Sequence, residues 1–239
     1  MSEVIEVLAM SVLSPESGGD RRVAMLPTLP QSFEEWKSVY EPSDDTFLLC
    51  DALEQDRAYL NATRPQVVLE VGSGSGCVIT FLAKLLQVDG GLQTHCLATD
   101  INPAAVLATM ATARANGVAV DVIRTGLVDG LLAGLISRGG VDVLLFNPPY
   151  VPTPDEEVGG SGIEASWAGG EDGRVVIDKF LPLLPLILSP TGRCYLVLVQ
   201  DNKPAQITKL LSTRFNLKSE IVLRRQAFNE SLQIMMIQR

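Results

Sequence analysis

Residues 141–150 read Val-Asp-Val-Leu-Leu-Phe-Asn-Pro-Pro-Tyr, and this stretch decides the fold. Its first six residues are too few for a helix and rich in branched side chains, which favours a core strand of a sheet covered on both faces. Pro148 and Pro149 cannot continue that strand because they lack the N–H of a strand ladder, so the chain leaves the sheet as a stiff turn. Ligands of open α/β sheets bind just beyond the carboxyl ends of the strands, where we expect this turn.

The turn suits the binding of a planar NH₂ group. The Asn147 side-chain oxygen and the Pro148 carbonyl are two acceptors, and Tyr150 offers an aromatic face. An exocyclic amine or a carboxamide would fit between them. Such a nitrogen is a poor nucleophile, so its catalysis would come from positioning. The plainer alternative is a strand-ending turn with Asn147 as a cap.

Composition and charge exclude several classes of protein. The 239 residues suit one α/β domain or slightly more, and the net charge of −9 comes without a long basic run, which disfavours nucleic acid as a tightly held partner. The four cysteines form no Cys-x-x-Cys pair and His95 is the only histidine, so we expect no metal site and reduced, mostly buried thiols. The cysteines are Cys50, Cys77, Cys96 and Cys194.

The amino-terminal region gives no targeting signal. No stretch approaches the roughly 18 apolar residues of a membrane helix, and Met1–Met10 lacks the basic start of a secretory signal. We expect no membrane association and a cytoplasmic protein, with the nucleus as a second compartment. Residues 1–39 show no clean period and are interpreted as a partly disordered leader, in which Ser14–Asp20 is a turn or a disordered segment. Residues 40–239 form the predicted domain.

A glycine-rich loop follows the buried strand predicted from Val67. Gly72, Gly74 and Gly76 alternate between this strand and an apolar helix, which allows a sharp turn and a close approach of a ligand. The third glycine falls one residue too early for a dinucleotide fingerprint, and Glu70 would repel a pyrophosphate. The pattern therefore favours a positively charged cofactor, of which S-adenosylmethionine is the natural candidate. The alternative is a glycine turn without a ligand.

The second strand, predicted from Thr94 to Thr99, ends in Asp100. An acidic side chain at this point is placed to accept hydrogen bonds from two ribose hydroxyls, although it could also serve as a helix cap. Asn102 is predicted to cap the next helix, with Pro103 at its first position and Asn116-Gly117 as its stop.

The remaining pattern predicts a doubly wound, mostly parallel α/β sheet of seven strands that ends in an antiparallel hairpin. The loop Val151–Gly173 is long enough for a lid, and its Trp167 either touches the substrate or anchors the loop to the core. The other predicted elements are a third strand Val120–Arg124, a helix Arg174–Leu188 bent or broken by Pro182 and Pro185, a fifth strand Cys194–Val199, a helix Ala205–Ser212, and final strands Leu217–Arg225 and Leu232–Ile237.

Taken together, the glycine loop with Glu70, Asp100 and the Asn-Pro-Pro-Tyr turn resemble class I S-adenosylmethionine methyltransferases that methylate amino groups, including the HemK-like protein-glutamine methyltransferases. Tyr40-Glu41-Pro42 with Asp45-Thr46, and Gly162–Ala165 with Trp167–Gly170, are similar to the eukaryotic and archaeal branch. That branch supplies the catalytic subunit that methylates the Gly-Gly-Gln glutamine of the class 1 release factor. The resemblance covers about Val39 to the carboxyl terminus.

The resemblance also implies roles for single residues. Asn147, Pro148, Pro149 and Tyr150 would be catalytic, and Asn147, Pro148, Tyr150 and Trp167 would bind the substrate. The cofactor would be S-adenosylmethionine, held by Tyr40, Thr46, Glu70, Gly72, Gly74, Gly76, Asp100, Ile101, Gly126, Leu127 and Asn147. At Gly126 the family usually has an acidic residue that receives the adenine amino group; here the backbone of Gly126 and Leu127, or the side chain of Asp129, would have to serve.

The resemblance further implies a small zinc-binding adaptor subunit that pairs with an edge strand, for which Val120–Ile123 is the expected docking edge. Three alternative functions remain open at this stage. They are adenine-N6 methylation of DNA or RNA, methylation of histone lysine, and a non-enzymatic adaptor that binds the cofactor without transferring its methyl group. Base flipping needs elements that hold the nucleic acid, and the sequence shows neither a spare domain nor a basic patch for them.

Overall fold

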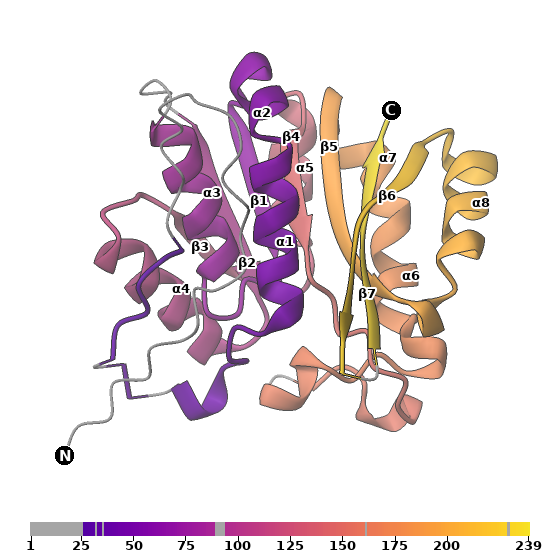
Figure 1. The fold of residues 1–239 in the computed structure, drawn as a ribbon, viewed down its shortest axis with the longest axis horizontal. Coiled ribbons are helices and arrows are strands. Elements are labelled where there is room, and N and C mark those ends of the chain that lie inside the picture. Colours follow the sequence, from indigo (N-terminus) through magenta and orange to yellow (C-terminus); the bar gives the residue numbers. More distant parts are fainter. Residues whose placement is uncertain (1–25, 32, 35, 89–93, 161, 229) are drawn as a thin grey trace.

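The computed structural model describes residues 26–31, 33–34, 36–88, 94–160, 162–228 and 230–239. Within these residues, seven strands form one sheet in the order β3-β2-β1-β4-β5-β7-β6 (Figure 1). Neighbours among the first five pair in parallel, which confirms the doubly wound fold. The strands are β1 Val67–Val71, β2 His95–Asp100, β3 Asp121–Arg124, β4 Val141–Phe146, β5 Leu188–Val199, β6 Lys218–Ala227 and β7 Glu230–Gln238.

Helices cover both faces of the sheet. The α1 helix packs on α3, which contacts α4, whereas α5, α6 and α7 lie behind the strands in Figure 1 and α8 packs on β6. The described α-helices are α1 Asp44–Gln55, α2 Arg57–Thr63, α3 Cys77–Val88, α4 Pro103–Ala115, α5 Leu132–Ser137, α6 Val175–Phe180, α7 Leu184–Ile187 and α8 Pro204–Phe215. Short 3-10 turns are η1 Trp36–Ser38, η2 Asp155–Glu157, η3 Ile163–Ser166, η4 Glu171–Gly173, η5 Leu181–Leu183 and η6 Gln200–Asn202.

The strand β4 lies at the centre of the sheet, as its sequence predicted. It pairs in parallel with β1 on one side and β5 on the other, and five of its six residues are buried. Asp142 is the exception, and its Oδ2 accepts hydrogen bonds from the backbone N–H groups of Gln66 (2.8 Å) and Val67 (3.1 Å). Because β1, β2 and β4 are parallel, the chain after Phe146 leaves the sheet at the carboxyl ends of all three strands.

One predicted helix break is confirmed and one strand start differs clearly from the prediction. The helix expected over Arg174–Leu188 is broken into α6, η5 and α7, because Pro182 and Pro185 each remove a backbone donor. The fifth strand starts at Leu188 rather than at Cys194. Pro190 is tolerated there because the ladder to β4 is irregular between Val141 and Val143.

The carboxyl-terminal hairpin has the predicted antiparallel strand. The strand β7 runs antiparallel to both β5 and β6, so β6 is again parallel to the main sheet. The amino-terminal side of the domain packs on α4: Phe33 and Trp36 contact a small apolar cluster that includes Val39 and Ala108. Ser14–Asp20 lies outside the described residues.

Candidate active site

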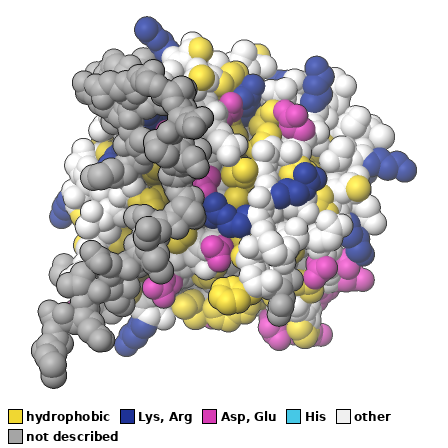
Figure 2. Space-filling view, viewed as in Figure 1, with side chains coloured by type: hydrophobic (Ala, Val, Ile, Leu, Met, Phe, Trp, Pro, Cys, Tyr) yellow, Lys and Arg dark blue, Asp and Glu magenta, His cyan; other side chains and the backbone are white. Residues whose placement is uncertain are grey.

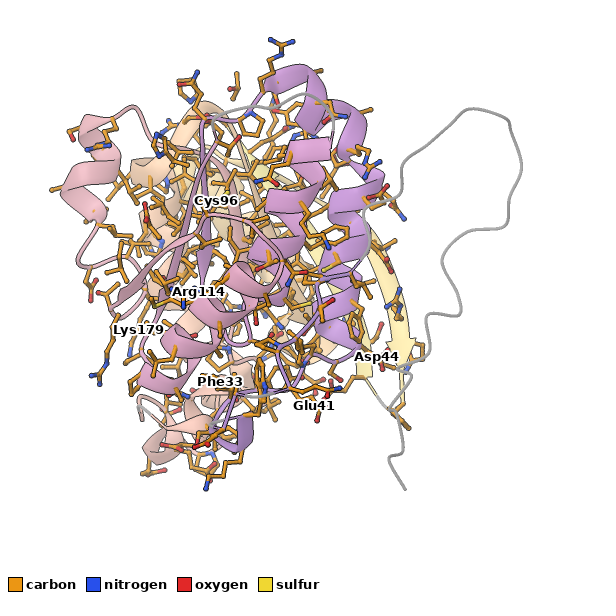
Figure 3. The ribbon with its side chains drawn as sticks, turned by 90° about the vertical axis from the view of Figure 1, so that its left-hand side faces the viewer. Phe33, Glu41, Asp44, Cys96, Arg114 and Lys179 are labelled. Carbon is orange, nitrogen blue, oxygen red and sulfur yellow. The ribbon has the colours of Figure 1, made fainter. Side chains whose placement is uncertain are left out.

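A cavity of about 270 Å³ opens at the carboxyl ends of β1, β2 and β4, where the sequence placed the ligand site. Most of its surface is apolar, and three charged side chains, Glu70, Asp100 and Lys179, line it. Figure 3 shows Lys179 projecting from its helix, α6. The predicted site residues that line the cavity are Tyr40, Thr46, Glu70, Gly72, Gly74, Asp100, Ile101, Gly126, Leu127, Asn147 and Pro149.

Four predicted site residues lie elsewhere. Pro148 is buried and does not line the cavity. The Tyr150 side chain is also buried off the cavity wall, where its hydroxyl contacts a carboxylate described below. Trp167 is 39% exposed, and only its neighbours in the loop line the cavity. Gly76 packs on α4: a Cβ built on it would lie 2.6 Å from the Cα of Thr109.

The loop after β1 comes close to the cavity through glycines in left-handed backbone conformations. Gly72 has φ of +66° and Gly74 has φ of +53°, a region that favours glycine. The backbone N–H of Gly74 donates to Asp100 Oδ2 at 2.9 Å, which joins the ends of β1 and β2. The other carboxylate oxygen, Oδ1, accepts from the N–H of Asn102 at 2.9 Å. These bonds fix the Asp100 carboxylate at the cavity wall.

Both carboxyl groups of the cavity are strongly desolvated. Burial raises the pKa of Glu70 well above its usual range, although the backbone N–H of Ile79 donates to its Oε2 at 2.9 Å and opposes the shift. Burial also raises the pKa of Asp100, against the bonds from Gly74 and Asn102. A buried carboxyl with a raised pKa is stabilised as a carboxylate when a positive charge enters, so the cavity favours a cationic occupant.

The turn after β4 contains a buried hydrogen-bond acceptor without a partner. Asn147 lines the cavity, and its Oδ1 is buried and accepts no hydrogen bond from the described residues. A buried unpaired acceptor costs about 1 to 3 kcal/mol, so native structures rarely keep one without a function or a ligand. The Asn147 Nδ2 donates at 3.0 Å to Asp45 Oδ2.

Asp45 is the residue that the sequence reasoning missed as a member of the site. It occurs in the Asp45-Thr46 motif, but a carboxylate in the first turn of a helix is also the ordinary partner of the helix dipole. In the structure it is 3% exposed, and its Oδ2 accepts from the hydroxyls of Tyr40 (3.1 Å) and Tyr150 (3.2 Å) as well as from Asn147. The sequence signal that could have identified Asp45 is its position just before the buried apolar residues of α1, which predicts a buried carboxylate.

The third strand brings its carboxyl-terminal loop to the cavity as predicted. Gly126 and Leu127 line it, and the Leu127 carbonyl accepts from Thr99 Oγ1 at 2.8 Å. Asp129 is not part of the lining, but its Oδ2 lies 3.7 Å from the space that a Cβ on Gly126 would fill. The acidic side chain is thus near the adenine edge proposed from the sequence without reaching the cavity wall.

The long loop after Tyr150 closes another side of the cavity. Backbone bonds pair Val151 with the end of this loop, from Val151 N–H to the Trp167 carbonyl (3.0 Å) and from Gly169 N–H to the Val151 carbonyl (2.9 Å). The loop residues that line the cavity are Val158, Gly159, Gly160, Gly162, Ala165, Ser166 and Ala168. Most of these side chains are small.

The residues of the cavity fit S-adenosylmethionine by their chemistry. Asp100 offers carboxylate oxygens for ribose hydroxyls, Glu70 adds negative charge for a cation, and Lys179 supplies one positive charge for a carboxylate. Among the described residues, no group of three His, Cys, Asp or Glu side chains could hold a metal ion. In the same part of the chain, no helix has the length and apolar character required to cross a membrane.

No family model matches the chain. It is 50% identical over 200 residues to the methyltransferase HEMK2 of Mus musculus, an alignment that covers 84% of this chain and 89% of that protein. The chain belongs to the HEMK2–Mtq2 methyltransferase family. It is 37% identical over 219 residues to the eRF1 methyltransferase catalytic subunit mtq2 of Schizosaccharomyces pombe, covering 86% and 91% of the two chains.

Solved structures agree with this family. The Mtq2 chain of the E. cuniculi Mtq2–Trm112 complex, described as responsible for methylation of the eRF1 termination factor, matches with a TM-score of 0.61 and 27% identity over 84% of this chain and 98% of that chain. The T. thermophilus 16S rRNA N2 G1207 methyltransferase shares the fold, with a TM-score of 0.56 and 19% identity over 83% of this chain and 44% of that chain. As a member of the HEMK2–Mtq2 family, the protein is a methyltransferase whose cofactor is S-adenosylmethionine.

Proposed function

We propose that the chain methylates the side-chain amide nitrogen of the glutamine in the Gly-Gly-Gln motif of a class 1 translation release factor. The observation that carries the proposal is the buried, unpaired Oδ1 of Asn147, which lies in the stiff turn beside the cavity. A primary carboxamide offers an N–H donor for this acceptor. The similarity to mtq2 of S. pombe, which is named an eRF1 methyltransferase, supports the choice of substrate.

The cavity residues divide between the two ligands. Glu70, Gly72, Gly74 and Asp100 would hold the cofactor, with the backbone near Gly126 at its adenine end. S-adenosylmethionine, when bound, supplies an electrophilic methyl group. Asn147 lines the same cavity, so a substrate nitrogen that binds its Oδ1 is close to the methyl donor.

The chain's own contribution to the reaction is orientation. The lone pair of an amide nitrogen is delocalised into the carbonyl, so it attacks only when it is aimed at the carbon that it alkylates. The Asn147 Oδ1 accepts one N–H of the substrate amide, whereas Pro148, the second acceptor expected from the sequence, does not line the cavity. As the nitrogen–carbon bond forms and the bond from that carbon to the sulfonium sulfur breaks, the nitrogen becomes more acidic, which strengthens its hydrogen bond to Asn147 in the transition state. The nitrogen then releases one proton to water.

No observation favours the alternative functions. Among the described residues on the face of the molecule in Figure 2, basic and acidic side chains are interspersed, without the continuous basic band that duplex nucleic acid would need. A lysine substrate would need a further group that removes its proton before the methyl transfer. The complete Asn-Pro-Pro-Tyr turn argues against an adaptor that only binds the cofactor.

A partner subunit of small size forms part of the proposal. The strand β3 lies at the edge of the sheet, as predicted, and its residues are only partly buried. Ile101 (40%), Leu107 (48%) and Met110 (49%) are exposed on and beside the neighbouring helix α4. An unpaired strand edge beside exposed apolar side chains is typical of a protein interface. The Mtq2–Trm112 complex supports a heterodimer, and we propose that the adaptor binds zinc.

Mass spectrometry of a purified class 1 release factor tests the reaction. The factor is incubated with S-adenosylmethionine and the enzyme, co-expressed with the adaptor. We expect one methyl group on the glutamine of Gly-Gly-Gln, and none with the Asn147→Ala variant. Cofactor binding without transfer to glutamine would contradict the proposed substrate. A large loss of thermal stability in Asn147→Ala would make Asn147 a structural cap instead.

A pair of charge substitutions tests the partner surface. Met110→Glu on α4 is expected to abolish co-purification with the adaptor, because it places a charge in the proposed interface. Ile136→Glu on α5 is the matched control, since Ile136 is 49% exposed on another helix. Equal loss of the complex with both variants would contradict a docking site at β3 and α4.

A further inference from the structure

Asp45 accepts five hydrogen bonds although it is buried at the start of α1. Its Oδ1 accepts from the backbone N–H (2.6 Å) and the hydroxyl (3.2 Å) of Thr46. Its Oδ2 accepts from Tyr40, Tyr150 and Asn147. Burying a carboxylate is costly unless donors replace its water, and none of the ion pairs among the described residues includes Asp45. All of its donors are neutral. These hydrogen bonds therefore hold the donor side chains in fixed orientations around the carboxylate.

The contact between Asp45 and Asn147 fixes which end of the Asn147 amide faces Asp45 and which end faces away from it. A primary amide can be rotated by half a turn with little change in shape, which exchanges its oxygen and its NH₂ group. A carboxylate accepts hydrogen bonds and donates none, so the NH₂ group must face the Asp45 Oδ2. The reversed amide would place two oxygens against each other. The Asn147 Oδ1 is therefore held in the orientation in which it has no partner within the protein.

We propose that Asp45 is the positioning residue for Asn147, and that it makes this asparagine an acceptor for the N–H of the substrate. The inference rests on the proposed function, in which the substrate nitrogen carries that N–H. It goes further by assigning the orientation of the catalytic amide to a residue of α1, 102 positions earlier in the chain. An acceptor at this point selects amino and amide groups and rejects a carboxylate or a carbonyl oxygen.

The two tyrosines keep the Asp45 carboxylate in place. Burial raises the pKa of Tyr40 and of Tyr150 above their ordinary value, and the Asp45 charge raises both further. Both hydroxyls therefore stay protonated and keep donating at any pH in which the enzyme would work. Tyr40 lines the cavity and Tyr150 follows the two prolines, so the group connects the cofactor wall with the substrate turn.

The substitution Asp45→Asn separates positioning from packing because it keeps the shape of the side chain. Its oxygen still faces the Thr46 N–H, because a backbone N–H cannot accept from an NH₂ group, whereas the Tyr40 and Tyr150 hydroxyls at the Oδ2 position can turn and accept. Its NH₂ group then takes the place of Oδ2 and faces the Asn147 NH₂ group. Two NH₂ groups repel each other, and the Asn147 amide reverses to place its oxygen on the new donor. The substrate would then meet a donor instead of an acceptor.

The expected kinetic result follows from this reversal. Asp45→Asn should lower kcat on the release factor by about 100-fold, the size of effect that a misplaced reacting group causes, while the Kd of S-adenosylmethionine changes less than about threefold. The matched control is Asp44→Asn in the same helical turn (Figure 3), which removes the same charge from a side chain without a bond to Asn147. The control should keep kcat within about twofold of the wild type.

A second measurement does not depend on turnover. The side-chain NH₂ resonance of Asn147, assigned by its loss in Asn147→Ala, is followed by ¹H–¹⁵N NMR in the adaptor complex with the cofactor bound. A proton that is donated to a carboxylate resonates downfield. We expect this shift in the wild type and in Asp44→Asn, and its loss in Asp45→Asn.

Two results would overturn the inference. The first is full turnover by Asp45→Asn, and the second is an Asn147 resonance that does not change in this variant. If the wild-type enzyme methylates no glutamine, the proposed function fails, and the Asn147 resonance then decides the inference without it.

Discussion

The side-chain Nδ2 of Asn202 donates to the main-chain oxygen of Tyr150 at 2.9 Å, although the two residues are 52 positions apart. Asn202 is fully buried in η6, directly after β5, and its Oδ1 accepts from the backbone N–H of Val199 at 2.8 Å. Its Nδ2 also reaches the carbonyl of Asp172 at 3.0 Å. One amide thus joins the end of a core strand to both ends of the loop that begins after the Asn-Pro-Pro-Tyr turn.

Asn202→Ala should therefore destabilise the domain and loosen the turn. It leaves several buried backbone groups without partners, which we expect to cost about 2 to 3 kcal/mol in the free energy of unfolding. The turn around Asn147 loses its support, and we expect kcat to fall by about tenfold. Urea unfolding of the adaptor complex and methylation kinetics measure the two effects.

The control for this variant is Gln206→Ala on α8. Gln206 is exposed and accepts one hydrogen bond from Arg174 at 3.2 Å, so its loss should change the free energy of unfolding by less than about 0.5 kcal/mol. Equal effects of the two substitutions would show that the Asn202 contacts add nothing to the stability of the turn.

Local sequence was sufficient to predict most of the fold. The strand β4, the glycine turn after β1 and the start of α4 at Asn102-Pro103 each depend on neighbours within a few residues, and each was found as predicted. In α4 the Asn102 Oδ1 accepts from the Ala104 N–H at 2.9 Å, which is the expected cap. The early start of β5 was missed because Pro190 is a local signal against a strand, and only the irregular ladder with β4 allows it.

The part of the site that the sequence did not predict depends on long-range contacts. The role of Asp45 exists only because β4 returns to α1 with Asn147. The packing of Gly76 likewise depends on Thr109, which lies on another helix. By contrast, Asp100 and Asn147 could be predicted because the carboxyl ends of parallel strands meet at one edge, whatever the rest of the chain does.

Glu70→Gln should stabilise the cofactor-free protein at neutral pH. Burial raises the pKa of Glu70, so its contribution to folding is fully present below the ordinary glutamate pKa and is lost as pH rises through the raised pKa. Glutamine stays neutral and still offers an oxygen to the Ile79 N–H. We expect the melting temperature of the wild type to fall from acidic to alkaline pH. The melting temperature of Glu70→Gln should fall less.

The same substitution should weaken cofactor binding. The ionised Glu70 attracts a cation, so the affinity of the wild type for S-adenosylmethionine should rise with pH, and that of Glu70→Gln should rise less. Titration calorimetry at several pH values measures this difference. Glu41→Gln is a control at an exposed carboxyl (Figure 3). If the affinity of Glu70→Gln for S-adenosylmethionine depended on pH as strongly as that of the wild type, another group would be responsible for the titration.

Gly76→Ala should lower the stability of the domain more than Gly74→Ala does. A Cβ on Gly76 would lie 2.6 Å from the Thr109 Cα, so this variant should lose about 2 to 3 kcal/mol of stability through forced separation of α3 and α4. A Cβ on Gly74 meets no atom within 4 Å, and its φ of +53° costs about 1 kcal/mol.

Cofactor affinity distinguishes these two glycines further. Gly74 lines the cavity and Gly76 does not, so Gly74→Ala should weaken S-adenosylmethionine binding more than Gly76→Ala does in protein that remains folded. Urea unfolding and calorimetry at a temperature well below both transitions measure the pair. A larger loss of cofactor affinity in Gly76→Ala would contradict this assignment and would support the sequence prediction that Gly76 binds the cofactor.

Gly126→Asn should strengthen cofactor binding. Gly126 lines the cavity, and a Cβ there would have the Asp129 Oδ2 at 3.7 Å, which is ordinary van der Waals contact, so a side chain fits. The new amide oxygen offers the adenine amino group an acceptor that glycine lacks, and its NH₂ group can donate to Asp129, whereas Gly126→Asp would place two carboxylates together. We expect the Kd of S-adenosylmethionine to fall about fivefold in calorimetry, the size of one added neutral hydrogen bond. Gly126→Ala adds the Cβ without the acceptor and should leave the Kd unchanged. An equal fall of the Kd in both variants would mean that shape, and not hydrogen bonding, limits the affinity at this end of the cavity.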